Sequence, residues 1–124
     1  MINIYIVLGI LFFHWIFDFV LQTDKDAKGK STSWKHLLNH TGIYSTCWFL
    51  LIMLYGCITP ALPFAILWFA PITFLAHTAT DYYTSKVNSQ LWKEGDSHGF
   101  FISIGFDQFL HFAQLLLTYY WLTS

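Results

Sequence analysis

Four stretches of the sequence are apolar over the length that a membrane-spanning helix needs. They cover roughly residues 3–22, 34–57, 60–83 and 100–122, each close to the ~20 residues that cross a hydrocarbon core of ~30 Å. Only 10% of the 124 residues are charged, whereas a soluble domain has ~25%. We therefore expect an all-α fold in which residues 1–124 form one integral-membrane domain, a four-transmembrane-helix bundle with short loops.

The lysines lie at two of the three connections between these stretches, while the connection at residues 57–63 is uncharged. The first connection has four of them, Lys25, Lys28, Lys30 and Lys35, and the third has two, Lys86 and Lys93. Because positively charged loops stay in the cytoplasm, we expect the first and third connections there and both termini on the non-cytoplasmic side. The first stretch lacks a basic start and a small-residue cleavage site, which predicts a retained span and not a signal peptide.

Charge and cysteine content exclude several kinds of partner. The net charge is -1 and there is no arginine, so no basic face for nucleic acid is expected. Cys47 and Cys57 lie ten residues apart without a metal or redox spacing, and are interpreted as packing residues. The expected partner is the lipid bilayer. A homo-oligomer is compatible with the small interior that four spans enclose.

Pairs of ionisable residues interrupt the apolar stretches at one common spacing of four. The pairs are His14/Asp18, His36/His40, His77/Asp81 and Asp107/His111. Residues i and i+4 share one face of a helix, so each pair presents two ligand-type groups to the same side. Counted from the cytoplasmic boundary at 1.5 Å per residue, all eight fall within roughly 17 Å of it. Ionisable residues at membrane depth are costly, and their convergence predicts a functional site.

The residue types in these pairs are typical of a metal site. Three Asp and five His without a thiolate suit divalent Zn, and also Fe or Mn. Two such ions carry four positive charges, which three carboxylates and one hydroxide would neutralise in a low-dielectric interior. Two other interpretations remain open. The pairs could be hydrogen-bonding groups that hold helices together, or a proton or ion pathway.

Several runs of the sequence resemble a known family. They are His14 to Gln22 (H-x3-D-F-x2-Q), His40 followed by Tyr44, His77 to Asp81 (H-x3-D) and Asp107 to His111 (D-Q-x2-H). They resemble a domain-of-unknown-function family of small bacterial and phage four-helix integral-membrane proteins, over nearly the whole chain. The resemblance implies an inner-membrane, bacterial or phage-encoded protein.

The resemblance also implies a set of site residues with one histidine in the second segment, at His40, which sets His36 apart. The implied set is His14, Asp18, His40, His77, Asp81, Asp107 and His111. Gln22 and Gln108 lie nearby. More loosely, the chain resembles membrane-bound metal-dependent hydrolases, which also use His and Asp on helices.

These observations lead to the hypothesis of a membrane-embedded metal-dependent hydrolase with a mono- or dinuclear His/Asp site near the cytoplasmic face. One or two Zn-type ions would lower the pKa of a bound water and make it a nucleophile. Gln22, Gln108, Ser85 and His36 would orient ligands or bind substrate. The shallow depth of the site favours a lipid-like or amphipathic substrate that arrives from the leaflet. His98 lies in a polar loop and is interpreted as solvated.

Two alternative functions use the same residues. A di-iron membrane oxidoreductase would hold iron in this cluster. A proton or metal-ion transporter would need a polar path through the outer half of the bundle, where the sequence is mostly Leu, Ile, Phe and Trp.

Overall fold

The computed structural model describes residues 3–124 and contains only helical elements over that range. In chain order these are α1 (Ile4–Trp15), the π-helical turn η1 (Ile16–Val20), α2 (Asp24–Gly29), α3 (Trp34–Ile58), the 3₁₀ segment η2 (Phe64–Trp68), α4 (Phe69–Lys93) and α5 (Ser97–Thr123). The expected all-α class is confirmed.

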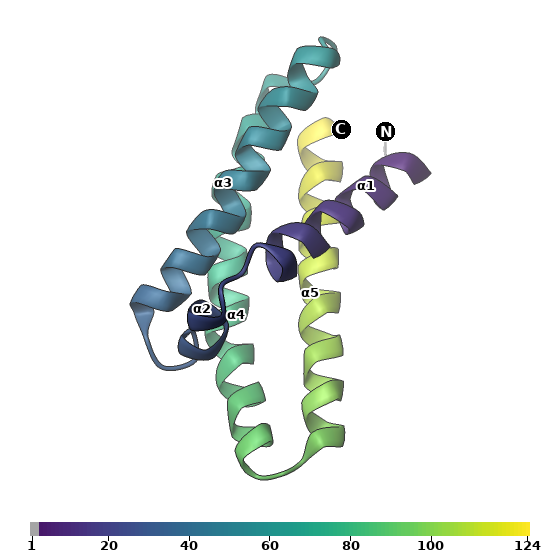
Figure 1. The fold of residues 1–124 in the computed structure, drawn as a ribbon. Coiled ribbons are helices and arrows are strands. Elements are labelled where there is room, and N and C mark those ends of the chain that lie inside the picture. Colours follow the sequence, from purple (N-terminus) through teal and green to yellow (C-terminus); the bar gives the residue numbers. More distant parts are fainter. Residues whose placement is uncertain (1–2) are drawn as a thin grey trace.

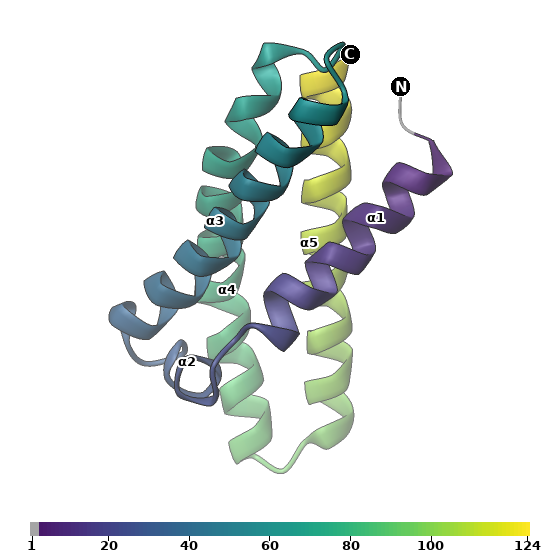
Figure 2. The same cartoon turned by 45° about the horizontal axis from the view of Figure 1, so that its top comes forward.

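The three long helices α3, α4 and α5 lie side by side, and α1 crosses them obliquely (Figures 1 and 2). The start of α1 and the end of α5 lie at one end of the bundle, while the α4–α5 turn lies at the other. The short helix α2 packs against α3 on the side of that turn. Consecutive long helices therefore run antiparallel, as short connections require.

Local sequence accounts for where several elements begin. Thr23 accepts a hydrogen bond from the Asp26 backbone N–H at the start of α2, and Asp96 does the same for Gly99 at the start of α5. Both residue types are favoured N-caps, because their side-chain oxygens satisfy otherwise unpaired amides. Gly95 has a φ of 73° in the α4–α5 turn, a conformation that strains other residues.

Helix α4 does not have the bounds of the third apolar stretch, residues 60–83. Helix α4 begins only at Phe69, after the 3₁₀ segment, and continues to Lys93. Pro71 lies in its first turn, where a missing N–H costs nothing. The last ten residues are mostly polar, so a hydrophobicity pattern does not detect them although they continue the helix.

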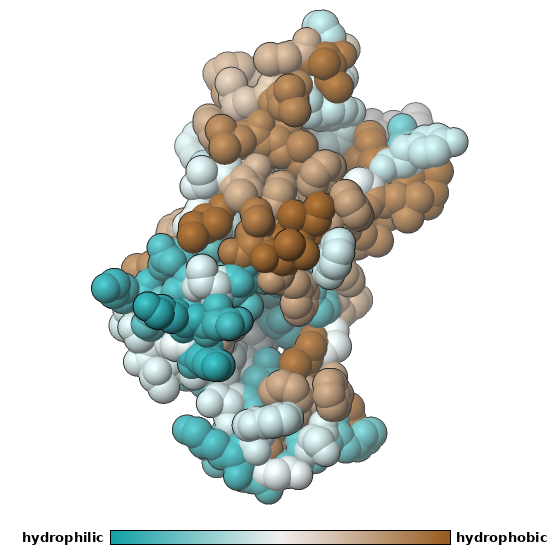
Figure 3. All heavy atoms as spheres, in the orientation of Figure 1, coloured by the Kyte–Doolittle hydropathy of each residue, from teal (hydrophilic) through white to brown (hydrophobic). Residues whose placement is uncertain are grey.

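Two helices of the described chain, α3 and α5, are long and apolar enough to cross a membrane. α1 and η1 together form a shorter apolar segment. Many large apolar side chains point outward, among them Tyr5, Leu54 and Phe64, which is 85% exposed. Apolar side chains cover the half of the bundle where α1 starts and α5 ends, and hydrophilic ones gather around α2 and the α4–α5 turn (Figure 3).

The interior has an apolar part and a polar part. Ile10, Trp48, Phe69, Leu115 and Tyr119 form the apolar part between α1, α3, α4 and α5. The buried ionisable side chains lie on the α2 side of this cluster.

Candidate metal centre

Seven of the eight paired residues meet in the polar part of the interior. They come from five helical elements, α1, η1, α3, α4 and α5, and each is at most 7% exposed: His14, Asp18, His40, His77, Asp81, Asp107 and His111. Asp18 reaches the centre from the π-helical turn η1, where the Leu21 N–H donates to the Ile16 carbonyl, five residues back. Such turns are often found at functional sites. The expected convergence of these seven residues is thus present in the structure.

Four of these residues offer one ligand atom each within 4.8 Å of one another: Asp18, His40, His77 and Asp81. The Nε2 atoms of His40 and His77 lie 3.2 Å apart, and they lie 3.0 and 3.3 Å from Asp18 Oδ1. The same two nitrogens lie 3.3 and 3.7 Å from Asp81 Oδ2. A tetrahedron with corners ~2.0 Å from a central ion has edges of roughly 3.3 Å. This first group therefore has the dimensions of a tetrahedral site.

A second group shares Asp81 with the first and adds Asp107 and His111. His111 Nε2 lies 3.1 Å from Asp81 Oδ1 and 3.3 Å from Asp107 Oδ1. The two oxygens of Asp81 thus face different groups, Oδ2 the first and Oδ1 the second. This is the arrangement of a carboxylate that bridges two ions. The second group has three protein ligands, as catalytic zinc sites do.

His14 touches the cluster but belongs to neither group. Its Nε2 lies 2.7 Å from Gln108 Oε1 and its Nδ1 lies 2.6 Å from the Tyr44 hydroxyl. These contacts fit a ring that donates from Nε2 to Gln108 and accepts the Tyr44 proton at Nδ1. Both ring nitrogens are therefore engaged. As the chain stands, His14 orients its neighbours, and its expected place as a ligand would need these bonds to open.

Gln108 connects His14 to two carboxylates. While its Oε1 accepts from His14, its Nε2 donates to Asp107 Oδ2 at 3.1 Å and to Asp18 Oδ2 at 3.4 Å. Thr84 also donates to Asp107, over 2.6 Å. Hydrogen bonds of this kind fix the orientation of ligating carboxylates. The expected supporting position of Gln108 is present, whereas nothing in the sequence pattern singled out Thr84.

Lys30 is a charged residue of the centre that the sequence pattern did not single out. It lies just after α2, and its Nζ donates to Asp81 Oδ2 over 2.9 Å. Burial lowers the pKa of the Lys30 ammonium, but the carboxylates of Asp81 and Asp18 outweigh burial and raise this pKa above its usual value. Lys30 therefore brings a fixed positive charge to the carboxylate that the two groups share.

The family comparison covers nearly the whole chain. A family model described as a protein of unknown function, DUF3307, matches residues 6–124. The chain belongs to the DUF3307 family. The expected membership in a domain-of-unknown-function family is confirmed. No curated protein and no solved structure matches the chain.

In this DUF3307 chain the eighth paired residue, His36, lies outside the centre. Its Nδ1 lies 2.9 Å from Asp26 Oδ1, and Asn39 donates to Asp26 Oδ2 over 2.6 Å. A Cβ added at Gly29 would collide with the His36 ring, so the glycine lets α2 approach α3 closely. These contacts join α2 to α3, and the expected orienting role of His36 at the centre has no contact to support it.

Two expected supporting residues, Gln22 and Ser85, line a polar cavity of about 650 Å³ beside the centre. Its inner end reaches Asp18, Asp107 and Gln108. His98 is exposed, as expected, but it lies in the first turn of α5 and not in the expected polar loop.

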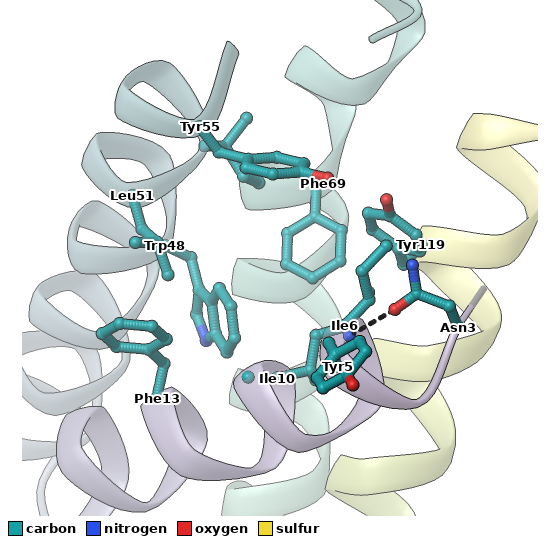
Figure 4. Close-up of a pocket in the computed structure, with 12 residues that line it drawn as sticks. Asn3, Tyr5, Ile6, Ile10, Phe13, Trp48, Leu51, Tyr55, Phe69 and Tyr119 are labelled. Atoms are coloured by element: carbon teal, nitrogen blue, oxygen red, sulfur yellow. Dashed lines mark hydrogen bonds between the residues drawn. The ribbon is translucent and has the colours of Figure 1, made fainter. Parts of the chain in front are cut away.

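On the opposite side of the centre lies an apolar cavity of about 420 Å³, between α1, α3, α4 and α5. Figure 4 shows Trp48, Phe69 and Ile10 around it, with Asn3 near its edge. Polar access to the centre therefore comes from the side of α2.

The buried Asp26 carboxylate leads to a prediction about α2. Burial alone raises the pKa of Asp26, but hydrogen bonds from His36 and Asn39 outweigh burial and lower this pKa below its usual value. The stabilisation from Asp26 is therefore full above its unfolded pKa and is lost as the pH falls through its folded pKa. At neutral pH we expect Asp26→Ala to speed amide hydrogen exchange in α2 about tenfold, since a hydrogen bond to a charged group contributes ~1.5 kcal/mol or more.

The matched control is Asp24→Ala, on the same helix with an exposed side chain. Equal exchange rates for the two variants would contradict the anchoring role of Asp26. As the pH falls, exchange in wild-type α2 should also slow less than the chemical exchange rate predicts, because the Asp26 stabilisation is lost.

Proposed function

We propose that this protein is an integral-membrane, metal-dependent hydrolase whose two ligand groups bind two divalent ions bridged by Asp81. The observation that carries the proposal is the placement of the Asp81 oxygens, one facing each group. The burial of seven ionisable side chains at one place in the bundle supports it, because so many ionisable groups are too costly to bury for packing alone.

The proposal includes four membrane spans: α1 with η1, α3, α4 and α5. The outward-facing apolar residues support this arrangement, since a lipid environment would cover them. The lysines in and after α2 and those near the end of α4 lie at one end of the bundle, where Lys86 Nζ donates to the Ser31 carbonyl over 2.9 Å. Under the positive-inside rule that end faces the cytoplasm of an inner membrane.

The chemistry proposed for the centre is the hydrolysis of a bond by water. A divalent ion in a site with three protein ligands lowers the pKa of a coordinated water and so supplies a nucleophile near neutral pH. Asp81, Asp107 and His111 would hold this ion. Gln108 and Thr84 keep the Asp107 carboxylate in place, and Asp107 also lines the polar cavity through which substrate and water would arrive. Zn is our first choice for this N/O ligand set.

Protonation of the histidines bears on the number of ions. The Nδ1 atoms of His77 and His111 lie 3.1 Å apart, so one of the two donates and the other accepts. The accepting neutral ring carries its proton on Nε2, the atom that would ligate. Filling both groups therefore requires this pair to release a proton or the two rings to separate, and proton release on metal binding is general.

The lining of the cavities and the identity of the metal distinguish the hydrolase from the two alternatives, a transporter and an oxidoreductase. A transporter would need polar groups on both sides of the centre, and the apolar cavity in Figure 4 disfavours such a path. An oxidoreductase would contain iron with charge-transfer absorption, whereas a zinc hydrolase is colourless. Ion flux in proteoliposomes would support the transporter against our proposal.

The test is elemental analysis of protein purified without chelators. We expect about two divalent ions per chain in the wild type, matching the two ligand groups. Asp107→Ala and His111→Ala should each lower the content to about one ion, since each removes a ligand of the second group only.

His98→Ala is the matched control, because it removes an exposed imidazole from the same helix. Equal metal content in all three variants would contradict the proposal. One ion per chain in the wild type would remove the bridging role of Asp81.

A further inference from the structure

Several side-chain atoms of residues that line the polar cavity beside the centre have no hydrogen-bond partner. Within the described residues 3–124, five buried side-chain atoms lack a hydrogen-bond partner, and three of them belong to residues that line this cavity: Gln22 Oε1, Ser85 Oγ and Asn88 Oδ1. Ser85 is only 7% exposed. Buried polar atoms are nearly always paired in folded proteins. Two of these atoms, Gln22 Oε1 and Asn88 Oδ1, accept hydrogen bonds, while the Ser85 hydroxyl can donate or accept, so the cavity offers several hydrogen bonds to water or to a polar ligand.

The same cavity has two positive charges on its α2 side. Lys28 and Lys30 line it, and Lys30 reaches inward to Asp81. The lining acidic residues, Asp18 and Asp107, both belong to the ligand groups, so their charges are neutralised once those groups hold divalent ions. On the proposed function, then, the free charge in the cavity comes from ammonium groups, which attract an anion.

Aromatic side chains also line this cavity, and some of them are exposed at the outer surface. Trp92, Phe100, Phe101 and Phe19 line it, and Phe101 is 67% exposed. The lining of the cavity, of about 650 Å³, thus combines hydrophilic and cationic side chains with aromatic ones that are exposed at the surface. A small soluble anion would use only the hydrophilic and cationic side chains, whereas an amphipathic molecule would also use the aromatic ones.

We propose that this cavity binds the phosphate headgroup of a membrane lipid, which presents its phosphate monoester to the Asp107 end of the metal centre. This inference rests on the proposed function. Lys28 Nζ, the Asn88 amide N–H and the Ser85 hydroxyl would donate to the phosphate oxygens, and the acyl chains would lie along the aromatic side chains. In the reaction the oxygen of water forms a new P–O bond, the P–O bond to the lipid alcohol breaks, and a proton passes to that alcohol. The products are inorganic phosphate and a neutral lipid alcohol.

The experiment uses purified, metal-loaded protein in detergent and dioctanoyl phosphatidic acid as the probe. Native mass spectrometry counts bound ions and bound lipid together, and phosphate release measures turnover. We expect the phosphate lipid to bind in preference to dioctanoylglycerol, which lacks the phosphate. Lys28→Gln should raise KM about tenfold, the effect of losing one charge-assisted hydrogen bond, with the metal content unchanged. Asn88→Leu should likewise weaken lipid binding without loss of metal.

The matched control is Lys25→Gln, which removes an exposed lysine from the same short helix outside the cavity and should behave as wild type. Equal binding of the two lipids, or an unchanged KM in Lys28→Gln, would overturn the inference while the metal result still stands. Glycerol phosphate or inorganic phosphate binding as well as the lipid would also overturn it, in favour of a soluble anion. A wild type without metal would instead contradict the proposed function.

Discussion

Replacing Asp81 with Asn is expected to remove both ions at once. In the structure Oδ2 of this residue faces His40 and His77, while Oδ1 faces His111. Asparagine keeps the shape of the side chain but loses the charge and one of the two ligand oxygens. Loss of a residue that merely orients a ligand weakens metal affinity 10–100-fold, so loss of a shared ligand should exceed roughly 100-fold at each group. Elemental analysis should find well under one ion per chain.

Asp26→Asn is the matched control for this change. Asp26 is also a buried aspartate that accepts bonds from a histidine and an amide, but it lies outside the centre. We expect this variant to keep both ions, so a loss of metal in Asp81→Asn cannot be ascribed to the removal of any buried carboxylate. Two ions retained in Asp81→Asn would contradict the shared site.

The Lys30 contact sharpens the interpretation of the same variant. Because Lys30 Nζ donates to Asp81 Oδ2, the Asn substitution also leaves a partly buried ammonium without its carboxylate partner. A second variant, Lys30→Met, separates the two effects, since it removes the ammonium and keeps the ligand. We expect Lys30→Met to retain metal, and a loss as complete as that of Asp81→Asn would assign the role to the ion pair.

Much of the centre could be predicted from helical spacing alone. The i,i+4 pairs His77/Asp81 and Asp107/His111 lie on single faces of α4 and α5, and their common depth follows from counting residues along each apolar stretch. These predictions depend only on the geometry of a regular helix. They do not require knowledge of how the helices pack.

The remaining contacts depend on the rotation and approach of each helix, which spacing does not determine. His36 and His40 lie one turn apart on α3. His36 nevertheless contacts Asp26 of α2, whereas His40 contacts Asp18 in the centre. Lys30 reaches the centre because its side chain is long and its backbone follows α2. Such contacts arise from connections whose path the sequence pattern does not specify.

His40 of α3 contacts the centre whereas His36 does not, and this difference gives the second large expected effect, on metal binding. His40→Ala removes a nitrogen that lies 3.0 Å from Asp18, 3.2 Å from His77 and 3.3 Å from Asp81. The first ligand group then keeps three ligands and a cavity where the imidazole was. We expect its ion to bind at least about 100-fold more weakly, beyond the effect of losing an orienting residue.

His36→Ala is expected to give the opposite pattern, although it removes the same side chain one turn away on the same helix. It should keep both ions, because His36 contacts Asp26 and no ligand. It should also speed hydrogen exchange in α2, which His40→Ala should leave unchanged. Metal analysis and hydrogen exchange on the two variants therefore test the assignment in both directions. Loss of metal in His36→Ala, or its retention in His40→Ala, would require a centre built from a different face of α3.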